Sequence, residues 1–167
     1  MEPNFWIWLV TGLTPVIIGF IWYNPAVFGK AWMSSAGLTQ EQLEDGSKLW
    51  LLILLTYIFG VFASFILTGI TVHQIGIFSI LSSDPSFATE GSAVQTYFMD
   101  FMSKYGDVDR NFGHGAFHGV FATIGFVLPI IGMSAIYERR GWKYILVHCG
   151  FWAVCLAIMG GLIAMYF

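Results

Sequence analysis

The sequence feature that most restricts the fold of this chain is a set of four long apolar runs that contain no Asp, Glu, Lys or Arg. They cover residues 5–23, 49–81, 112–137 and 144–167. A helix needs about 20 apolar residues to cross the hydrocarbon core of a bilayer, which is about 30 Å thick. The pattern predicts an all-α membrane protein in which residues 1–167 form a single bundle of four transmembrane helices, with short interfacial helices in the connections.

The second run is longer than one crossing requires. We expect its transmembrane helix over about 49–75, with the remainder tilting, projecting from the membrane or breaking away at Gly76. The other helices are expected over about 5–23, 112–137 and 144–167, and an outer loop is expected over about 82–111.

The composition supports this class of protein. Hydrophobic residues make up 57% of the chain and charged residues 10%, whereas about a quarter of the residues in a typical soluble domain are charged. The formal net charge of −3 is small, and nucleic-acid binding needs a dense basic patch. We therefore expect membrane lipid and other membrane-protein chains or copies of itself as partners, and no nucleic acid.

The basic residues predict an orientation. Four crossings put both termini on one side of the membrane and the first and third connections on the other. Those two connections carry Lys30, Lys48, Arg139, Arg140 and Lys143, and the terminal side carries Lys104 and Arg110. Because cytoplasmic loops are enriched in Lys and Arg, we expect both termini outside.

Aromatic residues and a proline mark the end of the first helix. Trp and Tyr favour the membrane interface, and the residue before a proline disfavours helix. We interpret this interfacial motif as an anchor that turns the chain, or alternatively as a docking surface for lipid or a partner. Its residues are Trp22, Tyr23, Pro25, Phe28, Gly29 and Trp32.

Two further short helices are expected in the connections. Thr39 and Gln42 fit a capping box, so a helix should begin there and lead into the second crossing. In the outer loop, residues 97–102 mix aromatic side chains with Asp100 and are predicted to form an interfacial helix.

Small residues recur at spacings of three and four in the apolar runs, most regularly in the third. Helices in lipid associate by close packing, which small residues permit. Two interpretations stay open, namely packing within the bundle or an interface with another subunit or a substrate. The residues assigned to this role are Gly115, Gly119, Gly125, Gly132, Gly150, Ala157 and Gly161.

All histidines lie within the apolar runs, where polar side chains are costly and often functional. His114 and His118 share one face of the third helix, and His73 lies near the same outer end of the second. This cluster is interpreted as hydrogen-bonding residues, as a metal or haem site, or as a proton-sensing or gating group. His148 lies near the cytoplasmic end of the fourth helix and should not join it.

The sequence shows no recognisable catalytic centre, and we expect no enzymatic activity. The apolar runs hold no carboxylate for a proton relay. The two histidines of the third helix lack the glutamate of the H-E-x-x-H motif. Cys149 and Cys155 are six residues apart on one helix, so they face different directions and should not pair.

Two segments resemble a known family. Residues 19–25 (Gly-Phe-Ile-Trp-Tyr-Asn-Pro) and 28–33 (Phe-Gly-Lys-Ala-Trp-Met), followed by 37–39, are similar to the opening motif of the bacterial family called domain of unknown function 1761. Its members are small proteins with four predicted transmembrane helices. The resemblance implies this topology in a bacterial inner membrane and implies no activity. The outer loop is longer than expected for the family.

The leading hypothesis for function is association, as a homo-oligomer or as an accessory subunit of a larger membrane complex. Its basis is the small-residue pattern together with the missing catalytic chemistry. The alternative is a small transporter or channel, or a metal- or haem-binding protein that uses His73, His114 and His118.

Overall fold

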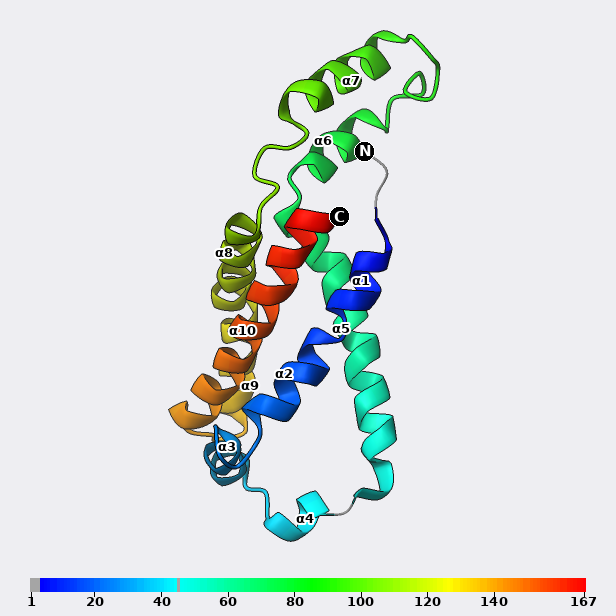
Figure 1. Ribbon diagram of the computed structural model, residues 1–167. Helices are drawn as coiled ribbons and strands as arrows, with labels where there is room; N and C mark the ends of the chain where they lie inside the picture. Colours follow the sequence, from blue (N-terminus) through cyan, green and yellow to red (C-terminus); the bar gives the residue numbers. More distant parts are fainter. Residues whose placement is uncertain (1–3, 45) are drawn as a thin grey trace.

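The computed structural model describes residues 4–44 and 46–167, and the regular elements among them are all helical. The first elements are α1 (Trp6–Thr11), α2 (Thr14–Trp22), α3 (Gly29–Ala36), α4 (Gln40–Glu44) and the 3-10 turn η1 (Gly46–Lys48). They are followed by α5 (Leu49–Thr71), α6 (Gln74–Leu81), α7 (Ala93–Tyr105), α8 (Phe112–Ala122), η2 (Thr123–Val127), α9 (Leu128–Tyr137) and α10 (Trp142–Tyr166). Figure 1 shows α6 and α7 projecting beyond one end of the long helices, and α3 and α4 at the other end.

Three helices are long and apolar enough to cross a membrane. They are α5, the continuous helix Phe112–Tyr137 formed by α8, η2 and α9, and α10, with mean hydropathies of 2.4, 2.1 and 2.0. Many of their large apolar side chains are exposed, as expected where lipid is the solvent. The all-helical, membrane-compatible class is therefore confirmed, with three long spans among the described residues where four were predicted.

The first apolar run forms a broken helix. α1 and α2 together cover Trp6–Trp22, a length of about 26 Å at 1.5 Å per residue. Pro15 has no N–H to donate to the carbonyl of Thr11, and the chain at the break is held by Leu13 N–H donating to the carbonyl of Val10 at 3.2 Å. The helix predicted over 5–23 is therefore shorter than expected and is interrupted.

The second apolar run breaks at Val72 and His73, and not at Gly76. Val72 has extended backbone, with φ −110° and ψ 91°, and α6 begins two residues later at Gln74. The helix expected over 49–75 therefore ends at Thr71. The rest of the apolar run leads away from the bundle toward α7 (Figure 1).

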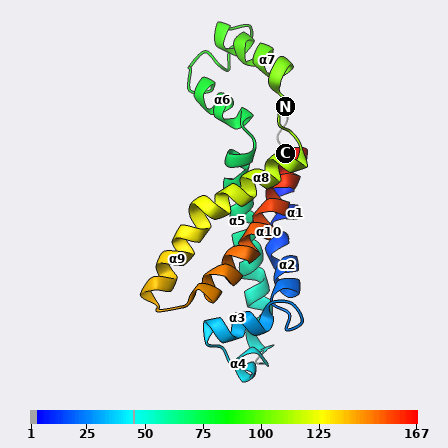
Figure 2. The ribbon, with the colours of Figure 1, turned by 90° about the vertical axis from the view of Figure 1, so that its left-hand side faces the viewer.

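The third long helix contains one π turn, η2. Pro129 lies two residues after it. A proline inside an α-helix lacks the N–H for the carbonyl four residues earlier, and its ring collides with that carbonyl. A widened turn accommodates the ring and redirects the helix. Figure 2 shows the result, with α9 swung to one side of the other helices.

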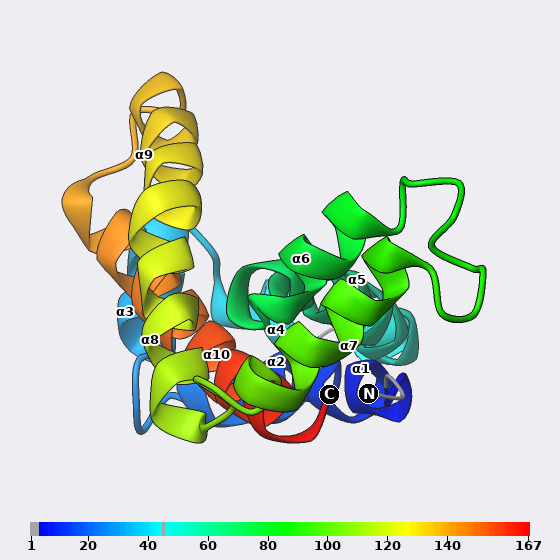
Figure 3. The same ribbon diagram turned by 90° about the horizontal axis from the view of Figure 1, so that it is seen from above.

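The central helix of the bundle is α10, on which Cys155, Met159 and Ile163 are completely buried. Figure 3 shows it between α8 on one side and α1 and α2 on the other. Its contact with α8 is very close, because an added Cβ on Gly115 would meet the carbonyl of Gly160. Such a contact of backbones is how helices associate in lipid.

A second close contact joins the first apolar run to α5. An added Cβ on Gly60 would meet the carbonyl of Gly12. One turn away, the hydroxyls of Thr11 and Ser64 are 2.8 Å apart and hydrogen-bonded. Buried hydroxyl pairs of this kind stabilise helix pairs where no water competes for the hydrogen bond.

Gly125 and Gly132 lie outside the contacts within the chain. An added Cβ on either would meet no atom of the described residues within 4 Å. The contact of α9 with α10 is made instead through Ala135, which packs against Ile145 and Cys149. The bundle-packing interpretation is therefore wrong for these two. The other small residues assigned to packing do lie at helix contacts; they are Gly115, Gly119, Gly150, Ala157 and Gly161.

The short helices of the connections begin where polar side chains cap them. Thr39 N–H donates to Gln42 Oε1 at 2.9 Å, and Gln42 N–H donates to Thr39 Oγ1 at 3.3 Å, so the predicted capping box is confirmed. The helix it starts, α4, ends at Glu44 and does not run directly into α5. In the outer loop, α7 is longer than the predicted 97–102 and begins with the Ser92 hydroxyl accepting from Gln95 N–H.

The close contact between α8 and α10 predicts a position-dependent effect of a single methyl group. Gly119→Ala is expected to lower the free energy of unfolding by about 1–3 kcal/mol, because the new Cβ collides with the backbone of Leu156. Gly125→Ala places the same methyl group in open space and should change the free energy of unfolding by less than about 0.5 kcal/mol. Thermal and denaturant unfolding in mild detergent, followed by tryptophan fluorescence, would measure both. Equal stability of the two variants would contradict the contact.

Candidate metal centre

Three histidines converge at the end of the bundle from which α6 and α7 project. The Nε2 atoms of His73 and His114 are 3.0 Å apart. The ring centroid of His118 lies 4.9 Å from that of His73 and 4.5 Å from that of His114. One nitrogen from each ring can be chosen so that all lie within 4.8 Å of one another. We call these residues the three-histidine cluster.

A helix break and a helix start position the cluster. His73 stands directly before the first residue of α6, so it belongs to the turn that ends the α5 span. At the start of α8, the side-chain Oδ1 of Asn111 accepts from the N–H of His114 at 2.9 Å, which fixes the first turn of that helix. His118 follows one turn later on the same face.

The spacing of the nitrogens suits a metal ion. Zinc binds imidazole nitrogen at about 2.0–2.1 Å, so two nitrogens of a tetrahedral site lie about 3.3 Å apart. The 3.0 Å between the Nε2 atoms of His73 and His114 is close to that value. Without a metal, one of these two nitrogens carries a hydrogen and donates a hydrogen bond to the other nitrogen. A bound cation would replace that hydrogen.

Asp109 lies on the far side of the His114 ring. Its Oδ1 is 3.7 Å from Nδ1 of His114, whereas Nε2 of the same ring faces His73. Metal-bound histidines commonly donate a hydrogen bond from their other ring nitrogen to a carboxylate, and this bond orients the ring. Asp109 has a left-handed backbone with φ 63°, a conformation that Asp adopts more readily than most residues.

Gln74 holds the loop that carries Asp109. Its buried Nε2 donates to the carbonyls of Tyr105, Gly106 and Val108 at 3.2, 3.1 and 2.9 Å. One side-chain amide thus fastens the start of α6 to the segment between α7 and α8. Sequence reasoning missed this residue. The available signal was a lone amide side chain in an otherwise apolar stretch.

His73 of the cluster lines a cavity of about 340 Å³ between α6, α7 and the loop that follows α7. His73 is exposed, and His114 and His118 are partly buried. A small solute can therefore reach the cluster at the end of the bundle from which α6 and α7 project. The residues that line the cavity are His73, Gln74, Ile77, Phe101, Tyr105, Val108 and Asp109.

The loop beside the cluster carries both signs of charge. Burial lowers the pKa of the Arg110 guanidinium, and the neighbouring Asp107 partly offsets this by raising it. Arginine normally titrates so far above neutral pH that it stays charged. The loop carries Asp107, Asp109 and Arg110, so it keeps a net negative charge that favours a nearby cation.

The interfacial motif lies at the opposite end of the bundle, and its rings pack inward. Trp22 Nε1 donates to the carbonyl of Val147 on α10 at 3.1 Å, and its ring lies 4.3 Å from that of Phe28. The ring of Tyr23 lies 4.8 Å from that of Trp32. The motif therefore fastens the corner between α2 and α3 onto α10.

Two residues of the motif shape the turn itself. Gly29 is buried so close to the carbonyls of Tyr23 and Asn24 that a Cβ would not fit. Pro25 is exposed at the tip of the turn. These contacts support the interpretation of the motif as an anchor, because the turn depends on close backbone contacts of Gly29 that a larger residue would break.

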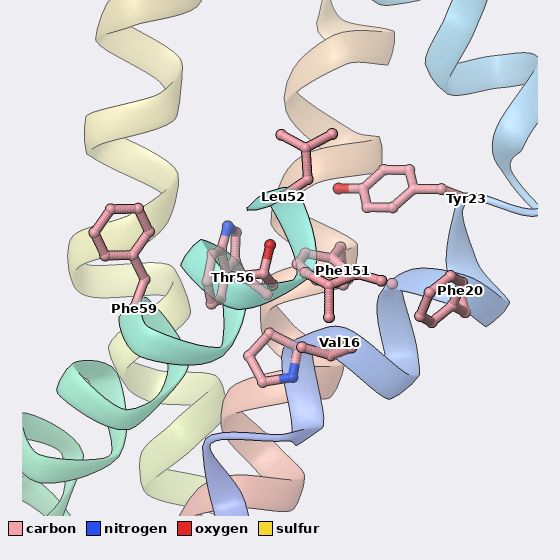
Figure 4. Close-up of a pocket in the computed structure, with 11 residues that line it drawn as sticks. Val16, Phe20, Tyr23, Leu52, Thr56, Phe59 and Phe151 are labelled. Carbon is pink, nitrogen blue, oxygen red and sulfur yellow. The ribbon is translucent and has the colours of Figure 1, made fainter. Parts of the chain in front are cut away.

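A groove of about 410 Å³ runs between α2, α5 and α10 (Figure 4). Its walls are mainly apolar, and the hydroxyls of Tyr23 and Thr56 are among the few polar groups that face it. The Tyr23 hydroxyl also lies 3.3 Å from Nδ1 of His148, which places that histidine here and away from the three-histidine cluster. An apolar groove on a spanning helix matches lipid chains and carries no chemistry of its own.

A comparison with models of known protein families identifies the family of this chain. Residues 6–164 match the family model described as "Protein of unknown function (DUF1761)". The chain belongs to this family. The match includes both the interfacial motif and the three-histidine cluster, and it confirms the resemblance seen in residues 19–39. No curated protein and no solved structure matches the chain. Membership of DUF1761 carries no activity, so function is argued from the geometry.

In this DUF1761 member, the role of Gln74 predicts a local loosening when its amide is removed. Gln74→Leu should speed hydrogen exchange in residues 105–111 about 10- to 100-fold, because each lost hydrogen bond contributes about 1 kcal/mol. Gln95→Leu is the matched control, since it removes only a bond to the N–H of Gly91 at the other end of α7. Deuterium uptake measured by mass spectrometry would report both. Unchanged uptake in Gln74→Leu would show that the amide does not hold the loop.

Proposed function

We propose that this protein is an integral membrane protein that binds one divalent transition-metal ion through His73, His114 and His118. The observation that carries the proposal is the convergence of three imidazoles from two spans, with nitrogens within 4.8 Å. Imidazole is a preferred ligand of zinc, copper, iron and nickel. Zinc fits best, because it accepts histidine nitrogens without demanding a planar or octahedral arrangement.

Hydrogen bonding alone accounts for only part of the cluster. It explains the contact between His73 and His114, but His118 makes no hydrogen bond through its ring to any described residue while still packing against both partners. Three polar rings brought together at the edge of an apolar bundle are costly without a shared ligand. A metal ion gives all three a common role.

Haem suits the cluster less well than a metal ion. A haem needs a flat slot for its macrocycle and an axial ligand that approaches perpendicular to it. Here the three imidazole rings contact one another, with centroids 4.5–5.0 Å apart. They leave no flat slot between them, so we do not assign a haem to this site.

The proposal places the metal centre on the outer side of a bacterial inner membrane. Asn4 N–H donates to the carbonyl of Phe167 at 3.2 Å, so the two ends of the described chain lie together near the cluster (Figure 1). Such an arrangement fits four crossings, with α1 and α2 together as the shortest. The excess of Lys and Arg at the opposite end then places that end in the cytoplasm.

Association with another membrane chain is a second candidate function, and one observation favours it. Gly125 and Gly132 present small surfaces that no other described residue covers, so a helix from another chain can approach them closely. Metal binding and association are compatible, because the two sites lie on different parts of the helix.

The metal proposal predicts binding of one Zn²⁺ or Co²⁺ per chain in detergent. His118→Ala is expected to weaken binding by more than about 100-fold, which exceeds the usual effect of losing only an orienting neighbour. Affinity should fall as the pH is lowered, because protons compete for the same imidazole nitrogens. Isothermal titration calorimetry and metal analysis of the dialysed protein would measure stoichiometry and affinity.

His148→Ala is the matched control for this measurement. His148 lies beside Tyr23 at the other end of the bundle, so the variant should bind metal like the unmodified protein. A protein that binds no metal, or binds it equally well without His118, would overturn the proposal.

The association proposal predicts a native particle larger than one chain. The mass of the protein in lipid nanodiscs or native detergent, measured by light scattering or native mass spectrometry, should correspond to two or more chains. Gly132→Leu should shift that mass toward the monomer, because the side chain would fill the space left for a second helix. A monomeric mass for the unmodified protein would contradict self-association.

A further inference from the structure

The protein itself supplies three of the four positions that a tetrahedral metal ion would fill. The ligand set that can be drawn from the described residues consists of His73, His114 and His118, with no thiolate or carboxylate among them. Both cysteines are buried on α10. The fourth position must therefore be filled by a residue that moves in or by a ligand from outside.

Asp109 is the acidic side chain nearest to the cluster, and it lies beside the His114 ring nitrogen that points away from His73. Asp109 Oδ1 lies 3.7 Å from Nδ1 of His114, and the two nitrogens of an imidazole point to opposite sides of the ring. A carboxylate on that side orients the ring of His114 and raises its basicity toward the metal. Asp109 in this position is a positioning residue and does not occupy the fourth position.

The cavity between α6, α7 and the loop that follows α7 adjoins the cluster at His73. His114 and His118 both come from α8 and cover one side of the cluster, whereas His73 lines the cavity directly. The remaining walls include Ile77, Phe101 and Tyr105, together with Asp109 as the one acidic residue of the lining. The cavity volume of about 340 Å³ is enough for several water molecules or a small organic anion.

The geometry points to an open, ligand-exchanging metal centre. Resting on the metal-binding function proposed above, we infer that the fourth position faces this cavity and takes an exchangeable oxygen- or nitrogen-donor anion. Water or hydroxide fills the position when no such anion is present.

Two physical properties support an anion as the exchangeable ligand. Three neutral imidazoles leave the charge of a divalent ion uncompensated within its ligand set, the carboxylate of Asp109 beside His114 offsets only part of it, and the partly apolar cavity strengthens the attraction of the remainder for negative charge. Structural zinc sites are closed by four protein ligands, whereas sites that handle a ligand keep one position for it. The centre is therefore suited to capturing or activating a small ligand at the outer surface.

Cobalt substitution with azide as the probe tests this inference. Co²⁺ bound to the full-length protein in detergent should give a visible absorption spectrum that depends on His118. Azide should then change that spectrum in a saturable manner with one anion per metal, and should have no effect on the metal-free protein. His148→Ala should behave like the unmodified protein in both steps.

The Asp109→Asn variant distinguishes an open fourth metal position from one that is occupied by the Asp109 carboxylate. If Asp109 only orients His114, the variant should bind Co²⁺ about 10- to 100-fold more weakly and should keep its response to azide. If instead Asp109 is the fourth ligand, the unmodified protein should resist azide and the variant should gain the response. Asp107→Asn in the same loop is the control for the loss of charge alone.

The outcomes distinguish this inference from the function on which it rests. A spectrum that depends on His118 and ignores azide would leave metal binding intact and overturn the open position. A protein with no such cobalt spectrum would overturn both. An azide response of equal size in His118→Ala would show that the anion binds elsewhere and would also overturn the inference.

Discussion

The close contact between α8 and α10 is the interaction on which the rest of this structure depends. Apolar side chains gain little by leaving lipid, so helices in a membrane associate where backbones can come very close. Gly115 and Gly119 provide that contact on α8. The same two turns carry His114 and His118 on a neighbouring face. Docking of α8 on α10 therefore determines where two of the three imidazoles stand, and the proposed metal centre depends on the glycines as much as on the histidines.

The third imidazole depends on the break in the second apolar run. If the second apolar run formed one continuous helix, its rigid backbone would carry His73 beyond the end of α8. The extended backbone at Val72 and the hydrogen bonds of Gln74 to the loop instead end the span where α8 begins. The carbonyls that receive the Gln74 amide belong to the loop leading to Asp109. A single amide thus connects the helix break, the loop and the carboxylate behind His114.

The sequence predicted the features that arise from local pattern and missed those set by distant contacts. Apolar run length placed the three long helices, and the spacing of His114 and His118 placed both on one face. Gln74 was missed because its acceptors lie more than 30 residues later in the chain. For Gly125 and Gly132 the spacing left packing within the bundle and an interface with another subunit open, and the contacts within the chain do not use either glycine. Whether the cluster binds metal is a question that spacing alone could raise and not answer.

The position of α10 in the chain has a consequence for biogenesis. The helix with more buried residues than any other described helix follows the other two long spans in the sequence, so the ribosome delivers it after them. Until it enters the membrane, the glycine face of α8 has no partner on α10, and Trp22 at the corner between α2 and α3 lacks the carbonyl of Val147 to which it donates. Insertion of the earlier helices and assembly of the bundle are therefore separate events. During the interval the exposed glycine surfaces are open to lipid, to chaperones or to the wrong helix.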